Sequence, residues 1–343
     1  KRMEKQAERL KAIHEAKDSF RIRIIPADEL YNEFSSGTPD ANAYRRYLKM
    51  LYDKAKTESD MPKYLLLFGD GAWDNRMLST AWLKEVPEDF LLCYESENSY
   101  SNTDCYVSDD YFCLLDDNEG GDMLHSDKPD VAVGRFPVRT VEQAMVMVDK
   151  VENYIRNQYA GAWQNTVCVM GDDGNNNQHM KDANEVSNLI EELRPTMQVK
   201  RVMWDAYPRV TTSTGNRYPD VTRLIRQQMA SGSLMMNYSG HGSPNAFSHE
   251  YVLNLQDFEE TVSTRLPLWV TASCDIMPFD GQHDNIGEAA VLNKNGGAIA
   301  FYGTTRTVYQ SYNIVMNLTF MRHLFGAGTN IAIGEAVRLA KNE

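Results

Sequence analysis

The sequence lacks the features of several common protein classes. No apolar run approaches the roughly 18 residues of a membrane-spanning helix. The opening residues, KRME, do not resemble a signal peptide, so we expect the targeting segment of an exported protein to lie outside this sequence. Basic residues are scarce: 35 Lys and Arg stand against 48 Asp and Glu, for a formal net charge of −13. This excess of acid argues against a nucleic-acid partner, because such a surface needs clustered Lys and Arg.

Cysteines are few, and no two of them are spaced as in a metal-binding motif. There are five, and none forms a CxxC pair, so a zinc ribbon is not indicated. Cys93, Cys105 and Cys113 have aromatic or apolar neighbours, as expected of buried cysteines that serve only in packing. Cys274 differs from them because it follows a predicted strand and has Ser273 and Asp275 beside it.

What is present is the pattern of a large α/β protein. The chain has 343 residues, and its hydrophobic content of 42% is sufficient for a real core. Alternating and apolar runs predict strands at 20–25, 63–68, 129–137, 166–170, 198–203, 234–238, 268–272 and 298–302, with a hairpin at 106–112. Helical spacing predicts helices at 3–18, after Asp40, after Thr140, and at 179–193, 218–229 and 286–293.

This order of strands and helices predicts a mostly parallel sheet flanked by helices, because β-α-β crossovers are right-handed. The pattern restarts after residues 157–163. We therefore expect two subdomains, an N-terminal non-catalytic one at 1–160 and a catalytic one at 161–343. The helical pattern is still running at the last residues, so we expect the chain to be a piece of a larger protein.

Two chemically reactive side chains follow neighbouring predicted strands in the second half. Strand 234–238 runs into SGHGS, which contains His241, and strand 268–272 runs into SCD, which contains Cys274. The carboxyl ends of parallel strands lie side by side, so these two residues can meet across one crevice.

Such a pair suits nucleophilic catalysis. A thiol attacks a carbonyl as thiolate, so it needs a base nearby and N–H donors for the oxyanion. His241 can serve as the base, Cys274 as the nucleophile, and the N–H groups of Gly242 and Cys274 as donors. The sequence therefore predicts a cysteine peptidase that needs no cofactor.

Other interpretations stay open. A metal site could draw on His241, His249, His283 and Asp284, although no HExxH spacing is present. A catalytically silent binding module is also compatible with the fold. The loops at 70–75 and 172–177 are dense in Asp and Asn and could hold a structural Ca²⁺, but neither matches the EF-hand pattern, which favours solvated loops.

Several motifs resemble one family. The stretch NYSGHGS at 237–243, TASC at 271–274 and GGAIA at 296–300 are similar to the gingipain family (C25) of caspase-like cysteine peptidases. Upstream, FSSGTPD at 34–40, LLLFGD at 65–70 and VGRFP at 133–137 resemble the sortase-type members of that family, which belong to the type IX secretion system of Bacteroidota. The resemblance extends over nearly the whole chain.

The resemblance implies a caspase-like fold with His241 as base and Cys274 as nucleophile. It also implies a carboxylate that orients the histidine, by position Asp130, although an Asp after Pro at the start of a strand is typical of a turn. By position, Tyr309 would line the substrate pocket, and we take Thr304, in the same loop region, as a second substrate-binding candidate. No pocket carboxylate matches, so gingipain selectivity for Arg or Lys is not carried over.

Sortase-type relatives cut the C-terminal sorting domain from secreted cargo and join the new end to an anionic lipopolysaccharide. The resemblance thus implies a transpeptidase whose partners are cargo proteins and other secretion-system components. It implies a secreted protein, or one at the outer-membrane surface of a Gram-negative bacterium. The alternative within the family is a secreted gingipain-like endopeptidase.

Overall fold

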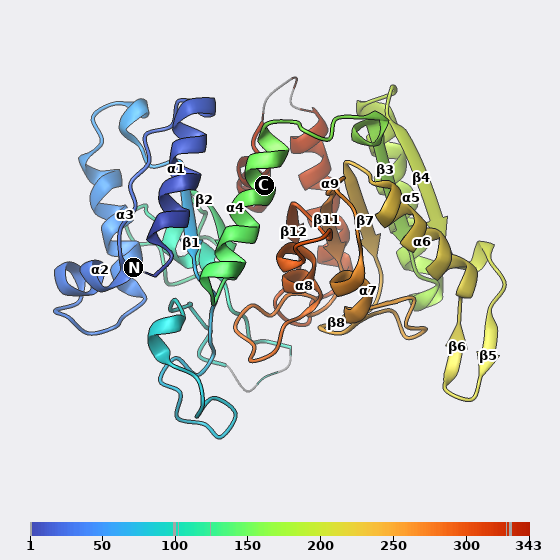
Figure 1. Ribbon diagram of the computed structural model, residues 1–343, viewed down its shortest axis with the longest axis horizontal. Helices are drawn as coiled ribbons and strands as arrows, with labels where there is room; N and C mark the ends of the chain where they lie inside the picture. The colour runs from blue at the N-terminus through green and yellow to red at the C-terminus, as the bar shows by residue number, and fades with distance from the viewer. Residues whose placement is uncertain (1, 99–100, 102, 124, 327, 329–330) are drawn as a thin grey trace.

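The second half of the chain forms a five-stranded parallel sheet. The computed structural model describes residues 2–98, 101, 103–123, 125–326, 328 and 331–343. The strand order is β12-β11-β7-β3-β4, and every neighbouring pair is parallel (Figure 1). The strands are β3 (Thr166–Gly171), β4 (Gln198–Met203), β7 (Met235–Ser239), β11 (Leu268–Ala272) and β12 (Ala300–Tyr302). The predicted α/β class with a mostly parallel sheet is therefore confirmed.

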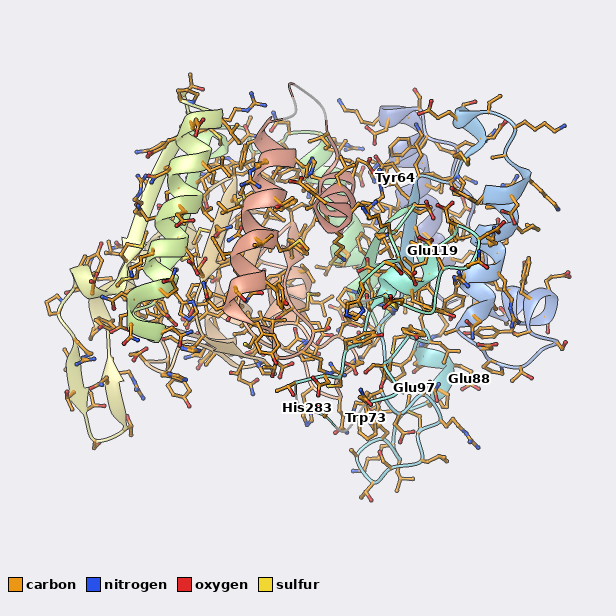
Figure 2. All side chains as sticks on the ribbon, turned by 180° about the vertical axis from the view of Figure 1, so that it is seen from behind. Tyr64, Trp73, Glu88, Glu97, Glu119 and His283 are labelled. Carbon is orange, nitrogen blue, oxygen red and sulfur yellow. The ribbon has the colours of Figure 1, made fainter. Side chains whose placement is uncertain are left out.

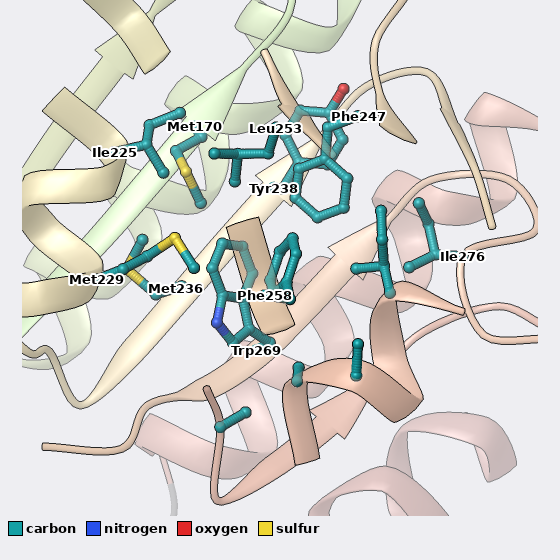
Figure 3. Packing of buried hydrophobic residues seen from close by; sticks show 14 of the residues in the cluster. Met170, Ile225, Met229, Met236, Tyr238, Phe247, Leu253, Phe258, Trp269 and Ile276 are labelled. Carbon is teal, nitrogen blue, oxygen red and sulfur yellow. The ribbon is translucent and has the colours of Figure 1, made fainter. Parts of the chain in front are cut away.

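Helices cover both faces of this sheet because both faces of its strands are apolar. On one face, Val167 and Val169 of β3 pack with α5 (Gly174–Leu193), α9 (Gln310–Gly326) and α10 (Ile333–Asn342). On the other, Cys168 and Met170 pack with α6 (Pro219–Ser231), α7 (Leu255–Glu260) and α8 (Ile286–Leu292). Figure 3 shows the second cluster, in which Phe258 of α7 packs against Trp269 of β11 and Tyr238 of β7 belongs to the same core.

The first half is built around a small parallel sheet of β1 (Tyr64–Phe68) and β2 (Ala132–Phe136). The helices of this half are α1 (Glu4–Asp18), α2 (Ala27–Phe34), α3 (Asn42–Lys54) and α4 (Val141–Ile155). As predicted, Thr140 caps α4: its side chain accepts the Gln143 N–H, and Gln143 returns the contact in a capping box. Both strands of this sheet precede residue 160, and all five strands of the larger sheet follow it. The subdomain boundary itself stays a prediction.

Two predicted elements differ from what the described residues show. Residues 20–25 form no strand: Ile22 and Ile24 are half-buried and Arg21 and Arg23 are exposed, but no neighbouring strand pairs with this segment. The hairpin at 106–112 forms in part: Val107 makes an antiparallel bridge with Glu95, and the N–H groups of Ser96 and Ser108 donate to the carbonyls of Tyr106 and Tyr94. Beyond it, Asp109–Cys113 is a 3₁₀ helix, because the Ser108 side chain accepts the Asp110 N–H and caps a helical turn. The alternation thus predicted the exposure of the side chains at 20–25 correctly but their pairing wrongly, and at 106–112 it predicted pairing correctly for the first residues alone.

The larger sheet has a topological switch point beside β3. The chain goes from β3 to β4 on one side, and then to β7, β11 and β12 on the other. In open parallel sheets, ligands bind outside the carboxyl ends of the strands at such a point. Two small antiparallel sheets complete the second half. One consists of β8 (Gly242–Ser243), β9 (Ala246–Phe247) and β10 (Leu253–Asn254), and the other is a hairpin of β5 (Val210–Thr212) and β6 (Gly215–Arg217). No helix in the described part of the chain is long and apolar enough to span a membrane.

Candidate active site

Three strands end side by side at the switch point. Gly171 at the end of β3 is in register with Ser239 of β7, which is in register with Ala272 of β11. The residues that follow these ends therefore emerge next to one another: Asp172 after β3, His241 after β7 and Cys274 after β11. The predicted convergence of the histidine and cysteine loops is thus found, with a carboxylate added.

The histidine loop is held by Asp172. Its carboxylate Oδ2 accepts the backbone N–H of His241 at 2.7 Å, and its Oδ1 accepts the N–H of Gly174 at 3.0 Å. The Tyr238 hydroxyl lies 2.7 Å from the His241 carbonyl oxygen and 3.2 Å from Asp172 Oδ2. Since Asp172 is only 1% exposed, these contacts fix the backbone of His241 through charge-assisted hydrogen bonds.

The imidazole ring of His241 lies among two other histidines. The ring of His249 stacks on it with centroids 4.4 Å apart, and the ring of His179 meets it edge-on at 4.9 Å. Burial lowers the pKa of His241 below its ordinary value, and positive charge on His179 or His249 lowers this pKa further, while Asp172 and Glu250 raise it. The neutral form, which can accept a proton, is therefore favoured.

Gly174 and Gly242 are where other side chains would collide with the site. A Cβ on Gly174 would lie 2.6 Å from Cδ2 of His241, so the ring rests directly on the backbone at the start of α5. A Cβ on Gly242 would lie 2.3 Å from Oγ of Ser273 and 2.4 Å from Cδ1 of Ile276. The loop that follows His241 is thus packed against the loop that contains Cys274.

Gly242 also presents an unused donor direction. Ser248 donates its N–H to the His241 carbonyl, and the next pair of the β8–β9 ladder is Gly242 with Phe247. Hydrogen-bonded and non-hydrogen-bonded pairs alternate along an antiparallel ladder, so Gly242 occupies a position where its N–H points away from β9. That N–H is available to a ligand.

Cys274 is half-buried, and its thiol lies within hydrogen-bond distance of the Val308 carbonyl oxygen, at 3.4 Å. A thiolate would have to give up this contact. The neighbouring Asp275 is also half-buried, and burial raises the pKa of its carboxyl group to about 6. The backbone N–H of Asp275 donates to the carbonyl of Arg306, so the segment after β12 lies along the loop that contains Cys274.

The two predicted substrate-binding residues lie on this same segment. The Thr304 hydroxyl donates to the Ser273 carbonyl at 2.5 Å and so ties this segment to the loop that contains Cys274. Tyr309 follows Val308 and is 62% exposed; its ring meets that of Tyr312, which is 72% exposed, edge-on at 6.2 Å. A substrate role for Tyr309 and Thr304 stays a prediction, and the hydroxyl of Thr304 is already committed to the protein.

Asp130 is not placed beside His241. It precedes β2, so it lies at the amino end of the small sheet, and its Oδ2 accepts the backbone N–H of Leu115 at 2.8 Å. The strand that separates it from the carboxyl ends has five residues, a length of about 16 Å. The carboxylate that contacts His241 is Asp172.

The sequence analysis did not identify Asp172 or His179 as site residues. It placed Asp172 in a polar loop and His179 at the start of a helix. The signal it could have used is position, because Asp172 directly follows the strand that neighbours β7.

The geometry gives little support to the metal sites considered from the sequence. In the part of the chain that the structure describes, no group of three or more His, Cys, Asp or Glu side chains is placed to hold a metal ion. Asp70, from one candidate calcium loop, is ion-paired with Arg139, and Asp172, from the other, accepts backbone N–H groups. Calcium binding stays an untested prediction.

Comparison with known proteins agrees with this arrangement. The family model "Peptidase family C25" matches residues 1–343. The chain belongs to peptidase family C25. It is therefore a cysteine-type peptidase whose substrates are proteins. No curated protein matches the sequence.

Solved structures show the same fold. The Arg-specific cysteine proteinase gingipain R (RgpB) superposes with a TM-score of 0.70 at 17% identity, over 97% of this chain and 68% of that one. The complex of the pro- and mature domains of RgpB from Porphyromonas gingivalis gives 0.70 at 18% identity, over 98% and 70%. Dimeric latent PorU from the same organism matches 47% of this chain and 15% of that one, at 40% identity and a TM-score of 0.42. At the low identity to RgpB, the likeness shows the gingipain-like fold.

Proposed function

We propose that Cys274 is the nucleophile of this peptidase, with His241 as its general base. The observation that supports this most is the close packing of the two loops at Gly242, where a Cβ would come within 2.3 Å of Ser273, the residue before Cys274. Loops packed this closely can bring the thiol and the imidazole within reach of proton transfer.

In this mechanism, His241 takes the thiol proton of Cys274, and the thiolate attacks the scissile carbonyl carbon. The N–H groups of Gly242 and Cys274 hold the oxyanion. His241 then gives the proton to the departing amine, and the acyl group remains on Cys274 as a thioester. Water or a second amine attacks the thioester, with His241 again accepting the proton of the attacking group. Asp172 keeps the His241 backbone in place.

We propose further that the acceptor is an amine, so that the protein acts as a sortase. It would remove C-terminal sorting domains from type IX secretion cargo and transfer the new end to a lipopolysaccharide. The support is the likeness of motifs in both halves of the chain to sortase-type C25 members. This role would place the protein at the outer-membrane surface, with cargo and other secretion components as partners. Simple hydrolysis, as in a secreted endopeptidase, is the second candidate.

Replacing the nucleophile tests the catalytic part. We expect Cys274→Ala to lose cleavage of a protein substrate by roughly 10⁴-fold, with the fold unchanged by circular dichroism. The control is Cys105→Ala, which removes another half-buried free thiol and should leave cleavage unchanged. Normal processing by Cys274→Ala would end the proposal. His241→Ala should give nearly the same loss.

Competition between acceptors tests the sortase part. The enzyme is incubated with a cargo protein that carries its C-terminal sorting domain, in the presence of diglycine as an amine acceptor, and the products are weighed by mass spectrometry. A sortase yields cargo extended by diglycine, in a ratio to hydrolysed cargo that rises with diglycine concentration. Products of water alone at every concentration would favour the endopeptidase.

A further inference from the structure

Helices α5 and α9 lie side by side on one face of the larger sheet, and each begins beside the candidate active site. Figure 2 shows them from behind, α5 in pale yellow-green and α9 in pale red. Ile190 of α5 and Phe320 of α9 belong to the same buried apolar cluster. Such packing holds the two helices together, but the hydrophobic effect is not directional and does not by itself fix how their first turns are aligned.

A buried carboxylate joins the two helices at the end next to the site. Asp182, in α5, is 4% exposed. Its Oδ1 accepts an amide N–H of Gln178 at 2.8 Å, and its Oδ2 accepts an amide N–H of Gln310, the first residue of α9. A carboxylate can only accept hydrogen bonds, so both glutamines must turn their nitrogens towards it. Because charge-assisted hydrogen bonds are short and directional, Asp182 fixes the start of α9 against α5.

On the α5 side, this helix also carries a neighbour of the proposed base. The ring of His179 meets the ring of His241 edge-on at 4.9 Å. Residues 175–177 are left-handed, with φ of 51°, 55° and 64°, and the regular part of α5 follows them. The contact between Gln178 and Asp182 spans four residues of this helix, so it stabilises the turn that contains His179.

On the α9 side, the segment before the helix contacts the proposed nucleophile. In the described part of the chain, two hydrogen bonds that involve a side chain connect residues 307–310 to other segments. One is the thiol of Cys274 on the Val308 carbonyl, and the other is Gln310 on Asp182. Since Val308 lies only two residues before Gln310, a shift of Gln310 would move the carbonyl that holds the thiol.

We propose that Asp182 is a positioning residue that links the helix beside the base to the segment that holds the nucleophile, and so sets the spacing between His241 and Cys274. It acts on Cys274 through Gln310 and the Val308 carbonyl. This inference rests on the proposed roles of Cys274 and His241, because spacing between them matters only if they exchange a proton.

A bound cation is a poorer explanation of this buried carboxylate. Each oxygen of Asp182 already accepts an amide N–H. Nor does the described structure contain a group of three or more acidic, His or Cys side chains placed to hold a metal ion. The charge of Asp182 is therefore used within the protein.

Exchanging donor and acceptor tests the contact directly. Gln310→Glu places a second carboxylate against Asp182, and the two like charges repel, so kcat on a protein substrate should fall about tenfold. The double variant Asp182→Asn/Gln310→Glu restores the bond with its direction reversed: the new amide nitrogen donates to the new carboxylate, and the new amide oxygen still accepts from Gln178. Its kcat should return to within about threefold of wild type.

Two further variants complete the comparison. Asp182→Asn alone should stay within about threefold of wild type, because the amide of Gln310 can turn over and accept instead of donate. The matched control is Gln227→Glu, which adds the same charge at an exposed position of α6 and should leave kcat unchanged. Full activity of Gln310→Glu, or a double variant as impaired as Gln310→Glu in a protein folded by circular dichroism, would overturn the proposal.

Alkylation by iodoacetamide, followed by peptide mass spectrometry, reads the thiol independently of catalysis. In Gln310→Glu, Cys274 should react about threefold faster, because the Val308 carbonyl no longer holds its thiol, and the double variant should return to the wild-type rate. The peptide that contains Cys105, another half-buried free thiol, should react at one rate throughout, since only a general loosening of the fold would expose it.

The two readouts separate this inference from the proposed function. An alkylation rate of Cys274 that is the same in wild type, Gln310→Glu and the double variant would overturn the positioning role of Asp182. If Cys274→Ala still cleaves substrate, it is the assignment of the nucleophile that fails, while the alkylation rates still decide whether Asp182 positions Cys274.

Discussion

Two aspartates occupy equivalent places in the two sheets and have different roles. Asp70 follows β1 in the sequence FGDG, and Asp172 follows β3 in MGDDG. Both are 1% exposed and both come one residue after a glycine at the carboxyl end of a parallel strand. Asp70 is ion-paired with Arg139, whereas Asp172 accepts the backbone N–H of His241.

The difference comes from the residue that follows the neighbouring strand in each sheet. β2, beside β1, is followed by Arg139, so Asp70 becomes part of a buried ion pair that joins the two halves. β7, beside β3, is followed by His241, so Asp172 becomes part of the candidate active site. One local motif thus contributes a buried ion pair in one sheet and holds the proposed base in the other. Its role is decided by the residue at the end of the adjacent strand.

The same substitution at both positions should separate these roles. We expect Asp172→Asn to lower kcat about 100-fold, because the His241 backbone loses its charge-assisted hydrogen bond and shifts. Asp70→Asn should lower kcat less than tenfold, but reduce the free energy of unfolding by about 2 kcal/mol through loss of the charged bond to Arg139. Steady-state kinetics and urea unfolding measure the two effects. Equal losses of kcat and of stability in both variants would break the comparison.

Added volume between the histidine and cysteine loops gives the next largest effect. Gly242→Ala places a Cβ against Ser273 and Ile276, so the two loops must separate and kcat should fall about tenfold or more. Gly134→Ala, in β2, is the control, since nothing lies within 4 Å of its Cβ position. A Gly242→Ala enzyme with full activity would show that the loops need not touch.

The smallest effect concerns the pH profile. A general base works in its neutral form, and the pKa of His241 lies below its ordinary value, so kcat/KM should fall only below about pH 6.5. His249→Gln removes a neighbour whose positive charge lowers that pKa, so the acid limb should move up by a few tenths of a pH unit. Asp172→Asn should move it down. The control, His125→Gln in the N-terminal half, should leave the acid limb of the kcat/KM profile where it is. An acid limb at the same pH in all variants would show that His241 is not the titrating base.

Strand ends were the part of the site that the sequence predicted best. The apolar runs before His241 and Cys274 are short, bounded by glycine or polar residues, and lie in a β-α-β order that leaves few topologies. Parallel packing of these strands then dictates that the two loops meet. The capping of α4 by Thr140 was predicted equally well, since a capping box depends on residues only three apart.

The sequence could not predict which distant residues or strands a given segment contacts. Residues 20–25 alternate as a strand would, but pairing depends on a neighbouring strand that no local pattern specifies. Asp130 was assigned by position relative to a family, although it precedes its strand and so lies at the amino end, away from the crevice. Asp172 was hidden in a polar loop because its partner, the His241 N–H, is 69 residues away in the chain.

The most direct test of the account is the mass of the enzyme during turnover. A protein substrate is mixed with the enzyme, the reaction is stopped by acid within one turnover, and the Cys274 peptide is analysed by mass spectrometry. The account predicts an acyl group on Cys274 that hydroxylamine removes, because a thioester is cleaved by that nucleophile, and no such adduct in Cys274→Ala. Substrate cleaved at the wild-type rate with no acyl group on Cys274 at any time point, or by the Cys274→Ala protein, would contradict it.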